Sequence, residues 1–302
     1  IHDGPMGQMV EDRFIRKALF TKINKNEEIE YKFNSKVTEH KKQFGYISVT
    51  LDNGTKLNTK LLVGADGRNS ELANRADIKK SGWKYNQNAL VCAIEHEADH
   101  NGVAWQYFMP SGPLAVLPMT GKRSSIVWTE QNANAKAINL FDETRYTKII
   151  AARLGNFLGK FKIIGDRHTY PLELSIADRF IDERLALIGD AAHSVHTIAG
   201  QGLNAGFKDI AVLAHIIQDA HNRGEDLGSL GVLKRYEEWR RFDSAQLAYS
   251  TDLFNKLFSN ENEALRLARN IGLKLLDSIP VAKRNIIKEA AGITGELPRL
   301  MH

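Results

Sequence analysis

The sequence predicts a fold of the mixed α/β class with more than one layer, and three observations predict it. The apolar run 185–188 leads through a glycine-containing segment into a strongly periodic stretch, as a buried strand followed by a helix does. Residues 83–128 are rich in aromatics, glycines and prolines, with strand candidates at the close spacing of an antiparallel sheet. From Leu227 onward the pattern is helical. A chain of 302 residues with 43% apolar composition can bury a large core, divided among one to three domains.

The first part of the chain predicts one helix and three strands. Residues 10–22 place Phe14, Ala18 and Leu19 at helical spacing and predict a short amphipathic helix. The dipeptide Asn53-Gly54 after Asp52 predicts a tight hairpin turn between the second and third strands. The predicted strands are residues 31–40, 46–51 and 56–63.

The second part alternates helix and strand. Residues 142–158 predict a helix and residues 163–174 a strand, before the buried strand 185–188. The clearest helix covers residues 202–222, because its apolar residues recur at three- and four-residue steps. One face of this helix carries Leu203, Phe207, Ile210, Ala214 and Ile217.

Composition limits the classes of partner. Lys and Arg number 41 against 36 Asp and Glu, which gives a net charge of +5, but the cations are scattered and indicate no nucleic-acid partner. The single cysteine, Cys92, excludes an intrachain disulfide and a cysteine-rich metal cage, and fits a reducing compartment. Apolar runs fall short of the roughly 18 residues that span a bilayer. We therefore expect a cytoplasmic location, at most peripheral at the inner face of the membrane.

The junction 189–202, GDAAHSVHTIAGQG, has two familiar interpretations that its details disfavour. His193 and His196 have the spacing of metal ligands, but they fall in an irregular loop without a cysteine or Glu-x-x-His partner, so we predict no metal. Residues 200–205 match the dinucleotide fingerprint G-x-G-x-x-A. That fingerprint requires a tight turn from strand to helix, whereas residues 190–200 form a long loop.

A third interpretation fits the residue types of this junction. Asp190, at the end of a strand, can accept hydrogen bonds from the hydroxyls of a sugar-like chain. The first amides of the helix, at Gly202, Leu203 and Asn204, carry the positive end of the helix dipole. The arrangement suits a ligand with a hydroxylated chain and a ring that becomes anionic, and reduced flavin is such a ligand.

Two motifs resemble those of the class A flavoprotein aromatic hydroxylases. Residues 189–209 are similar to their second flavin motif, and GADGRNS at 64–70 is similar to their other internal motif. The chain resembles in particular the ubiquinone-biosynthesis FAD-dependent hydroxylase family. That similarity runs through LVGADGRNS, GWKYNQNALVCAIEHE, GPLAVLPMTGKRSSIVWTE and RLALIGDAAHSVH, and covers nearly the whole chain.

The resemblance implies a partial Rossmann-like FAD-binding domain, an antiparallel-sheet substrate domain and a helical C-terminal tail. The FAD-binding domain would take residues 1–77 and 176–225, the substrate domain 78–175, and the C-terminal helices 226–302. The implied FAD-binding residues are Arg13, Asp66, Gly67, Gly189, Asp190, Gly200, Gln201, Gly202, Leu203 and Asn204.

The activity that the resemblance implies is a monooxygenation. A flavin hydroperoxide would hydroxylate the aromatic ring of a polyprenylated phenol in ubiquinone biosynthesis, with dioxygen as co-substrate and NADPH or another electron donor. The flavin carries the chemistry, so we expect no catalytic side chain. Thr197 stands where the family usually has a proline near the phenol. Other ubiquinone-biosynthesis proteins are further implied partners.

The family's strand-turn-helix unit with the true G-x-G-x-x-G loop has no counterpart before Val10. Because that unit holds the ADP half of FAD, we expect this chain by itself to bind FAD weakly or not at all. We also expect it to self-associate through apolar edges. An alternative from another class stays open, a flavin-free scaffold of the ubiquinone-biosynthesis complex.

Several of these residues also have a plain structural interpretation. Asp66 can be a turn acid, Asp190 can cap its own loop, and Arg13 can be a solvated residue of the first helix. The tail 265–291 can pack against the flavin domain or lie at a membrane interface. Five large side chains can line a quinol pocket or belong to the core: Trp83, Tyr85, Phe108, Met109 and Trp128.

Overall fold

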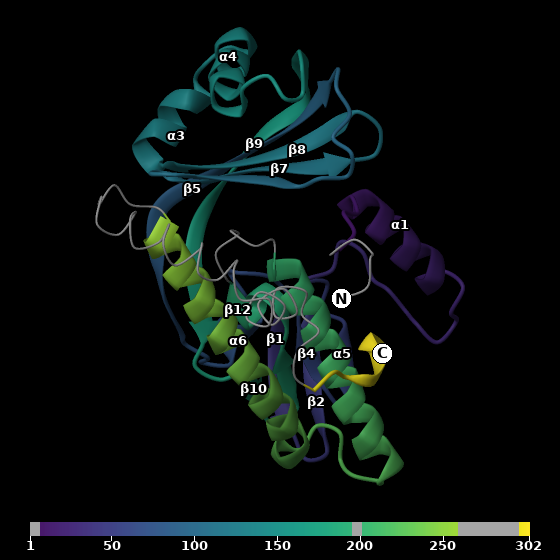
Figure 1. The fold of residues 1–302 in the computed structure, drawn as a ribbon. Coiled ribbons are helices and arrows are strands. Elements are labelled where there is room, and N and C mark those ends of the chain that lie inside the picture. Colours follow the sequence, from purple (N-terminus) through teal and green to yellow (C-terminus); the bar gives the residue numbers. More distant parts are fainter. Residues whose placement is uncertain (1–6, 195–200, 259–295) are drawn as a thin grey trace. The chain divides into compact units, whose positions relative to one another are not determined.

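The computed structural model describes residues 7–194, 201–258 and 296–302, and the chain divides into two compact units (Figure 1). Unit 1 consists of Ile1–Glu30, Asn86–Leu172 and Phe254–Thr294. Unit 2 consists of Tyr31–Tyr85, Glu173–Leu253 and Gly295–His302. Both motifs singled out in the sequence fall in unit 2. Among the described residues, no helix is both long enough and apolar enough to cross a membrane.

Unit 1 is an antiparallel sheet with two helices over one face (Figure 1). On β8, Ile126 and Trp128 are two positions apart and therefore share the face that packs against Tyr146 and Ile150 of the covering helices. The strands, in order of pairing, are β9 (Phe161–Ala177), β5 (Lys80–His96), β8 (Arg123–Gln131), β7 (Gly112–Met119) and β6 (Trp105–Met109). The helices are α3 (Asn132–Asn139) and α4 (Glu143–Leu154).

Local chemistry sets the bounds of the covering helices. Asp142 caps α4, since its Oδ1 accepts a hydrogen bond from the Arg145 amide at 2.7 Å, and Gly155 ends the helix with a φ of +72°. The helix predicted over 142–158 therefore exists but is shorter. Helix α3 was not predicted, because only Ala135 and Ile138 of its eight residues are buried. Helix α1 (Asp12–Ile23) confirms the helix predicted over 10–22.

Unit 2 contains two three-stranded sheets. One is an antiparallel meander, in which the Asn53-Gly54 turn joins the second and third strands as predicted. The other pairs two strands in parallel, with Gly64 opposite Leu187. The meander consists of β1 (Val37–Gln43), β2 (Tyr46–Leu51) and β3 (Lys56–Thr59), and the second sheet of β10 (Ile181–Asp182), β11 (Leu185–Leu187) and β4 (Leu62–Gly64). The short β12 (His193–Ser194) pairs with β9.

Three strand predictions need correction. The strand predicted over 31–40 begins only at Val37, because Asn34 adopts a left-handed conformation with a φ of +53° that interrupts an extended chain. The strand predicted over 56–63 is two strands, β3 and β4, which pair in different sheets. The strands expected to be short in 83–128 include β5, which has 17 residues because it belongs to both units.

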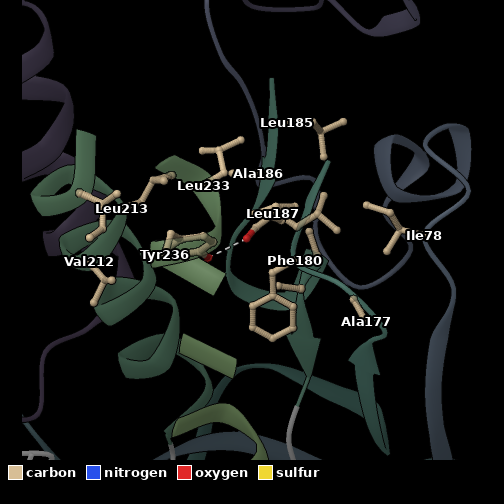
Figure 2. Packing of buried hydrophobic residues seen from close by; sticks show 14 of the residues in the cluster. Ile78, Ala177, Phe180, Leu185, Ala186, Leu187, Val212, Leu213, Leu233 and Tyr236 are labelled. Carbon is tan, nitrogen blue, oxygen red and sulfur yellow. Dashed lines mark hydrogen bonds between the residues drawn. The ribbon is translucent and has the colours of Figure 1, made fainter. Parts of the chain in front are cut away.

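The helices of unit 2 enclose its core, which Figure 2 shows in close-up. Leu185, Ala186 and Leu187 of β11 are fully buried and lie among side chains of both long helices. Tyr236 donates its hydroxyl hydrogen to the Leu187 carbonyl at 2.7 Å. The helices are α2 (Glu71–Arg75), α5 (Gln201–Asn222) and α6 (Leu230–Phe258), with single turns η1 (Gly189–Ala191) and η3 (Arg299–Met301).

Helix α5 was predicted with nearly correct bounds, but the first half of its apolar face does not pack on the core, whereas Ile217 in the second half does. Leu203, Phe207 and Ile210 are exposed, at 57%, 39% and 46% of their surface. The buried face is a stripe shifted around the helix and made mostly of small or aliphatic residues, with one acid. Its residues are Ala205, Asp209, Val212, Ile216 and Ala220.

Candidate functional site

The two motif loops leave the same edge of one sheet. β4 runs into the loop 64–70 and β11 into the loop 189–191, and these strands are parallel neighbours. Their ladder continues to the loops, because the Ile188 amide donates to the Gly64 carbonyl at 2.9 Å. The crevice outside the carboxyl ends of parallel strands is where α/β folds bind ligands. Segments that are far apart in the sequence, as Gly64 and its partner Leu187 are, thus form one candidate site within unit 2.

The first loop turns on Gly67, whose φ of +78° strongly favours glycine. Asp66 lies before this turn and is exposed, but its Oδ2 accepts a hydrogen bond from the Leu72 amide of α2 at 3.0 Å. Burial acts to raise the pKa of Asp66, and hydrogen bonds from Ser70 and the Leu72 backbone outweigh it and hold this pKa below its usual value. Asp66 therefore has a role in the turn itself.

The second loop places an acid at its tip. Gly189 has a φ of +57° and packs closely on α5. If Gly206 of α5 carried a Cβ, this atom would lie only 3.5 Å from the Gly189 Cα. Asp190 follows Gly189 and is exposed. Among the described residues, its carboxylate has no hydrogen-bond partner, whereas its carbonyl is engaged by Lys80. The Asp190 carboxylate is thus exposed at the candidate site.

Helix α5 begins beside this loop and contributes Gly202, Leu203 and Asn204 in its first turn. The amides of a first helical turn have no acceptor within their helix, and they carry the positive end of its dipole. Thr197 and Gly200 lie outside the described residues, as does the side chain of Gln201.

A buried ionic network beneath the second loop was not predicted. Asp209 of α5 accepts hydrogen bonds from the Gly189 amide at 2.7 Å, from His193 Nε2 at 2.8 Å and from Arg240 Nε of α6 at 2.6 Å. Burial acts to raise the pKa of Asp209, but His193 and Arg240 hold it below its usual value. The sequence signal was an acid within the apolar periodicity of α5. The described residues hold no cluster of three or more His, Cys, Asp or Glu suited to a metal ion.

Lys80, which belongs to neither motif, also lies at the site. Its Nζ donates to the Arg68 carbonyl at 2.8 Å and to the Asp190 carbonyl at 3.3 Å. Burial lowers the pKa of this ammonium, while the carboxylates of Asp66 and Asp190 act to raise it. Nothing in the sequence around Lys80 distinguishes it from the adjacent Lys79.

Other candidates lie elsewhere. Arg13 belongs to unit 1, where its guanidinium pairs with Glu11 at 2.8 Å and is mostly exposed. Trp128 is a fully buried core residue of unit 1, under the Arg153 guanidinium. Phe108 is partly exposed in the same unit, and Trp83 is partly exposed in unit 2.

Comparisons with known proteins bear on this arrangement. Residues 9–250 match the family described as "FAD binding domain". Ubiquinone hydroxylase UbiL of Rhodospirillum rubrum is 38% identical over 301 residues, which cover 99% of this chain and 70% of that protein. The mitochondrial ubiquinone biosynthesis monooxygenase COQ6 of Rattus norvegicus is 36% identical over 82% of this chain and 59% of its own length.

The fold is shared with a solved monooxygenase structure. The crystal structure of p-nitrophenol 4-monooxygenase PnpA from Pseudomonas putida matches 93% of this chain and 72% of its own, with a TM-score of 0.76 at 18% identity. The mixed α/β class with antiparallel sheets is therefore confirmed. The chain spans 70% of the length of the bacterial relative and 59% of the rat relative.

Proposed function

Because the chain belongs to the ubiquinone-biosynthesis FAD-dependent hydroxylase family, we propose that unit 2 holds the ring and ribityl chain of FAD in a flavoprotein monooxygenase. Its substrate is a polyprenylated phenol of ubiquinone biosynthesis, and its other reactants are dioxygen and electrons from NADPH or another donor. The observation that carries this proposal is the meeting of the two motif loops at the ends of β4 and β11.

The residues at these loops fit a flavin. The Asp190 carboxylate is exposed, and a carboxylate can accept hydrogen bonds from the ribityl hydroxyls. The glycine at the first turn, Gly67, lets a ligand approach the backbone closely, because a Cβ added there would meet nothing within 4 Å. Asp66 is exposed beside the first turn, where its carboxylate, held by Ser70 and the start of α2, faces the chain between the ring and the pyrophosphate.

When bound, FAD supplies the activation of dioxygen and the transfer of one oxygen atom to the phenol ring. The chain's own residues bind the cofactor and orient it. The amides of Gly202, Leu203 and Asn204 stabilise negative charge at the pyrimidine end of the ring, since a helix N-terminus favours an anion. We further propose a cytoplasmic location with peripheral contact at the membrane, where a polyprenyl chain dissolves.

The proposal predicts the effect of Asp190→Ala in the full-length protein. Loss of the charge-assisted hydrogen bonds to the ribityl chain removes about 1.5–3 kcal/mol, so FAD should bind about 10- to 100-fold more weakly. Flavin fluorescence on titration with the apoprotein gives the dissociation constant, and the visible spectrum of the purified protein gives the bound fraction.

Glu183→Ala is the matched control, because Glu183 is an exposed acid at the opposite end of β11. It should bind FAD like the wild type. Equal FAD affinity in the Asp190 and Glu183 variants would show that the loop 189–191 does not hold the cofactor.

A flavin-free scaffold is the second candidate, and one observation favours it. The Asp66 carboxylate already serves the turn before α2, so this motif does not need a ligand to explain its acid. The visible spectrum separates the two functions. A bound flavin band excludes the scaffold, and a colourless full-length protein that binds no added FAD excludes the monooxygenase.

A further inference from the structure

Lys80 is the first residue of β5 and lies outside both flavin motifs. Its ammonium nevertheless contacts the backbone of both motif loops, at the Arg68 carbonyl (2.8 Å) and at the Asp190 carbonyl (3.3 Å). Asp190 is 110 positions away from Lys80 in the sequence. One side chain therefore joins two segments that the chain order keeps far apart.

This contact extends the connection between the loops beyond the sheet. The parallel ladder of β4 and β11 ends at Gly64 and Leu187, followed by the hydrogen bond from Ile188 to Gly64. Arg68 and Asp190 lie further along, where the two loops have left the ladder. A cationic donor shared by two carbonyls there fixes their separation more firmly than a neutral donor does.

The loops are also anchored outward, each to a different element. Arg68 pairs its guanidinium with Glu173 of β9 at 3.3 Å. Gly189 donates its amide to Asp209 of α5 at 2.7 Å. Lys80 differs from these two contacts, because it joins one loop directly to the other.

The positive charge of Lys80 also fits a position between the two acidic loops. The carboxylates of Asp66 and Asp190 both interact favourably with its ammonium. Two acids that meet one ligand repel each other, and a cation between their loops offsets that repulsion.

We propose that Lys80 is a positioning residue of the FAD site, which holds the Asp66 and Asp190 loops at the separation that the cofactor requires. The inference rests on the proposed function and adds to it a residue outside both motifs. Lys80 acts through the backbone of the two loops and not through the reacting atoms.

The test compares Lys80→Met with Lys79→Met in the full-length protein. Methionine keeps the length of the side chain and removes the charge and the donors, and Lys79 is an exposed neighbour whose side chain engages neither loop. Three quantities are measured: the dissociation constant for FAD by flavin fluorescence, the amide hydrogen exchange of residues 64–70 and 189–192, and the melting temperature of the apoprotein.

We expect Lys80→Met to weaken FAD binding at least about tenfold, the effect of one charge-assisted contact, and to speed exchange in both loops. Lys79→Met should match the wild type, and Lys80→Arg should recover part of the affinity. If Lys80→Met does not fold, Lys80→Gln replaces it under the same criteria.

Two other outcomes overturn the inference, and they are distinguishable. In the first, Lys80→Met and Lys79→Met bind FAD with equal affinity. Lys80 is then at most a structural residue, whether or not its substitution speeds exchange or lowers the melting temperature. Failure of the wild type to bind FAD overturns the proposed function, and the role of Lys80 with it.

Discussion

Asp209 is the residue on which three parts of unit 2 converge. Its carboxylate is fully buried and accepts hydrogen bonds from the end of β11, from β12 and from α6, through Gly189, His193 and Arg240. A carboxylate buried in this way is tolerated because Arg240 compensates its charge and each donor uses one of its lone pairs. The conformation of the second loop therefore depends on an ionised group beneath it.

Asp209→Asn keeps the size of the side chain and removes its charge, which leaves the buried Arg240 guanidinium with Asp243, at 2.7 Å, as its remaining carboxylate partner. We expect a loss of about 1–3 kcal/mol in the free energy of unfolding, because hydrogen bonds to a buried charged group are weakened. Urea denaturation measures it. Glu238→Gln, the same chemical change at an exposed position of α6, serves as the control and should change little. A loss as small as that of the control would mean that the network contributes no stability.

The loss should depend on pH in a defined direction. The pKa of Asp209 in the folded state lies below its usual value, because His193 and Arg240 outweigh burial. A depressed folded-state pKa stabilises the fold fully above the unfolded pKa of about 3.9, and this stabilisation disappears as the pH falls through the folded value. The difference in unfolding free energy between wild type and Asp209→Asn should therefore shrink below about pH 4.

At the scale of elements, α6 packs against the central strand of the β10–β11–β4 sheet and also donates a hydrogen bond to it. Tyr236 is fully buried, and its hydrogen bond to the Leu187 carbonyl joins α6 to β11. Two residues later, β11 becomes the loop that carries Asp190. The attachment thus supports the strand end from which the candidate site is built (Figure 2).

Tyr236→Phe keeps the ring and leaves the Leu187 carbonyl without this donor. We expect a loss of about 1–3 kcal/mol of stability, the penalty of an unsatisfied buried acceptor. Tyr249→Phe is the matched control on the same helix, because Tyr249 is 71% exposed. Thermal and urea unfolding compare the two variants, and equal midpoints would show that the hydroxyl of Tyr236 contributes nothing.

Helix α5 shows what periodicity predicts and what it does not. The predicted bounds 202–222 differ from the structure by one residue. The first half of the most apolar stripe, with Leu203 and Phe207, is nevertheless exposed, while the stripe with Ala205 and Asp209 is buried. Spacing determines which residues share a face, but a buried acid and small residues lower the apparent hydrophobicity of the face that packs.

The candidate site was also predicted only in part. The two motif loops were predicted, because each is a contiguous stretch with a glycine turn and an acid. The contacts of Lys80 and Arg240 were not, since their partners lie 110 and 31 positions away and depend on the packing of whole elements. Long-range ionic contacts carry no local signal in a single sequence.

At the scale of the molecule, each unit has a core of its own. Ile150 lies in the cluster beneath α3 and α4, and Leu233 lies in the cluster between β11 and α6. The strands β5 and β9 contribute residues to both units, so the chain passes between them along continuous strands. Separate cores allow separate unfolding, whereas shared strands oppose it.

Ile150→Ala and Leu233→Ala test which effect dominates. Both side chains are fully buried, and each truncation should cost about 2–5 kcal/mol within its own unit. We expect Ile150→Ala to speed amide hydrogen exchange in residues 86–172 and to leave 185–253 protected, and Leu233→Ala to do the reverse. The two variants control for each other, because they remove similar volumes from different cores. If either variant sped exchange equally in both units, β5 and β9 would couple them into one cooperative structure, and a substitution in the core of unit 1 would then reach the candidate site of unit 2 through its stability.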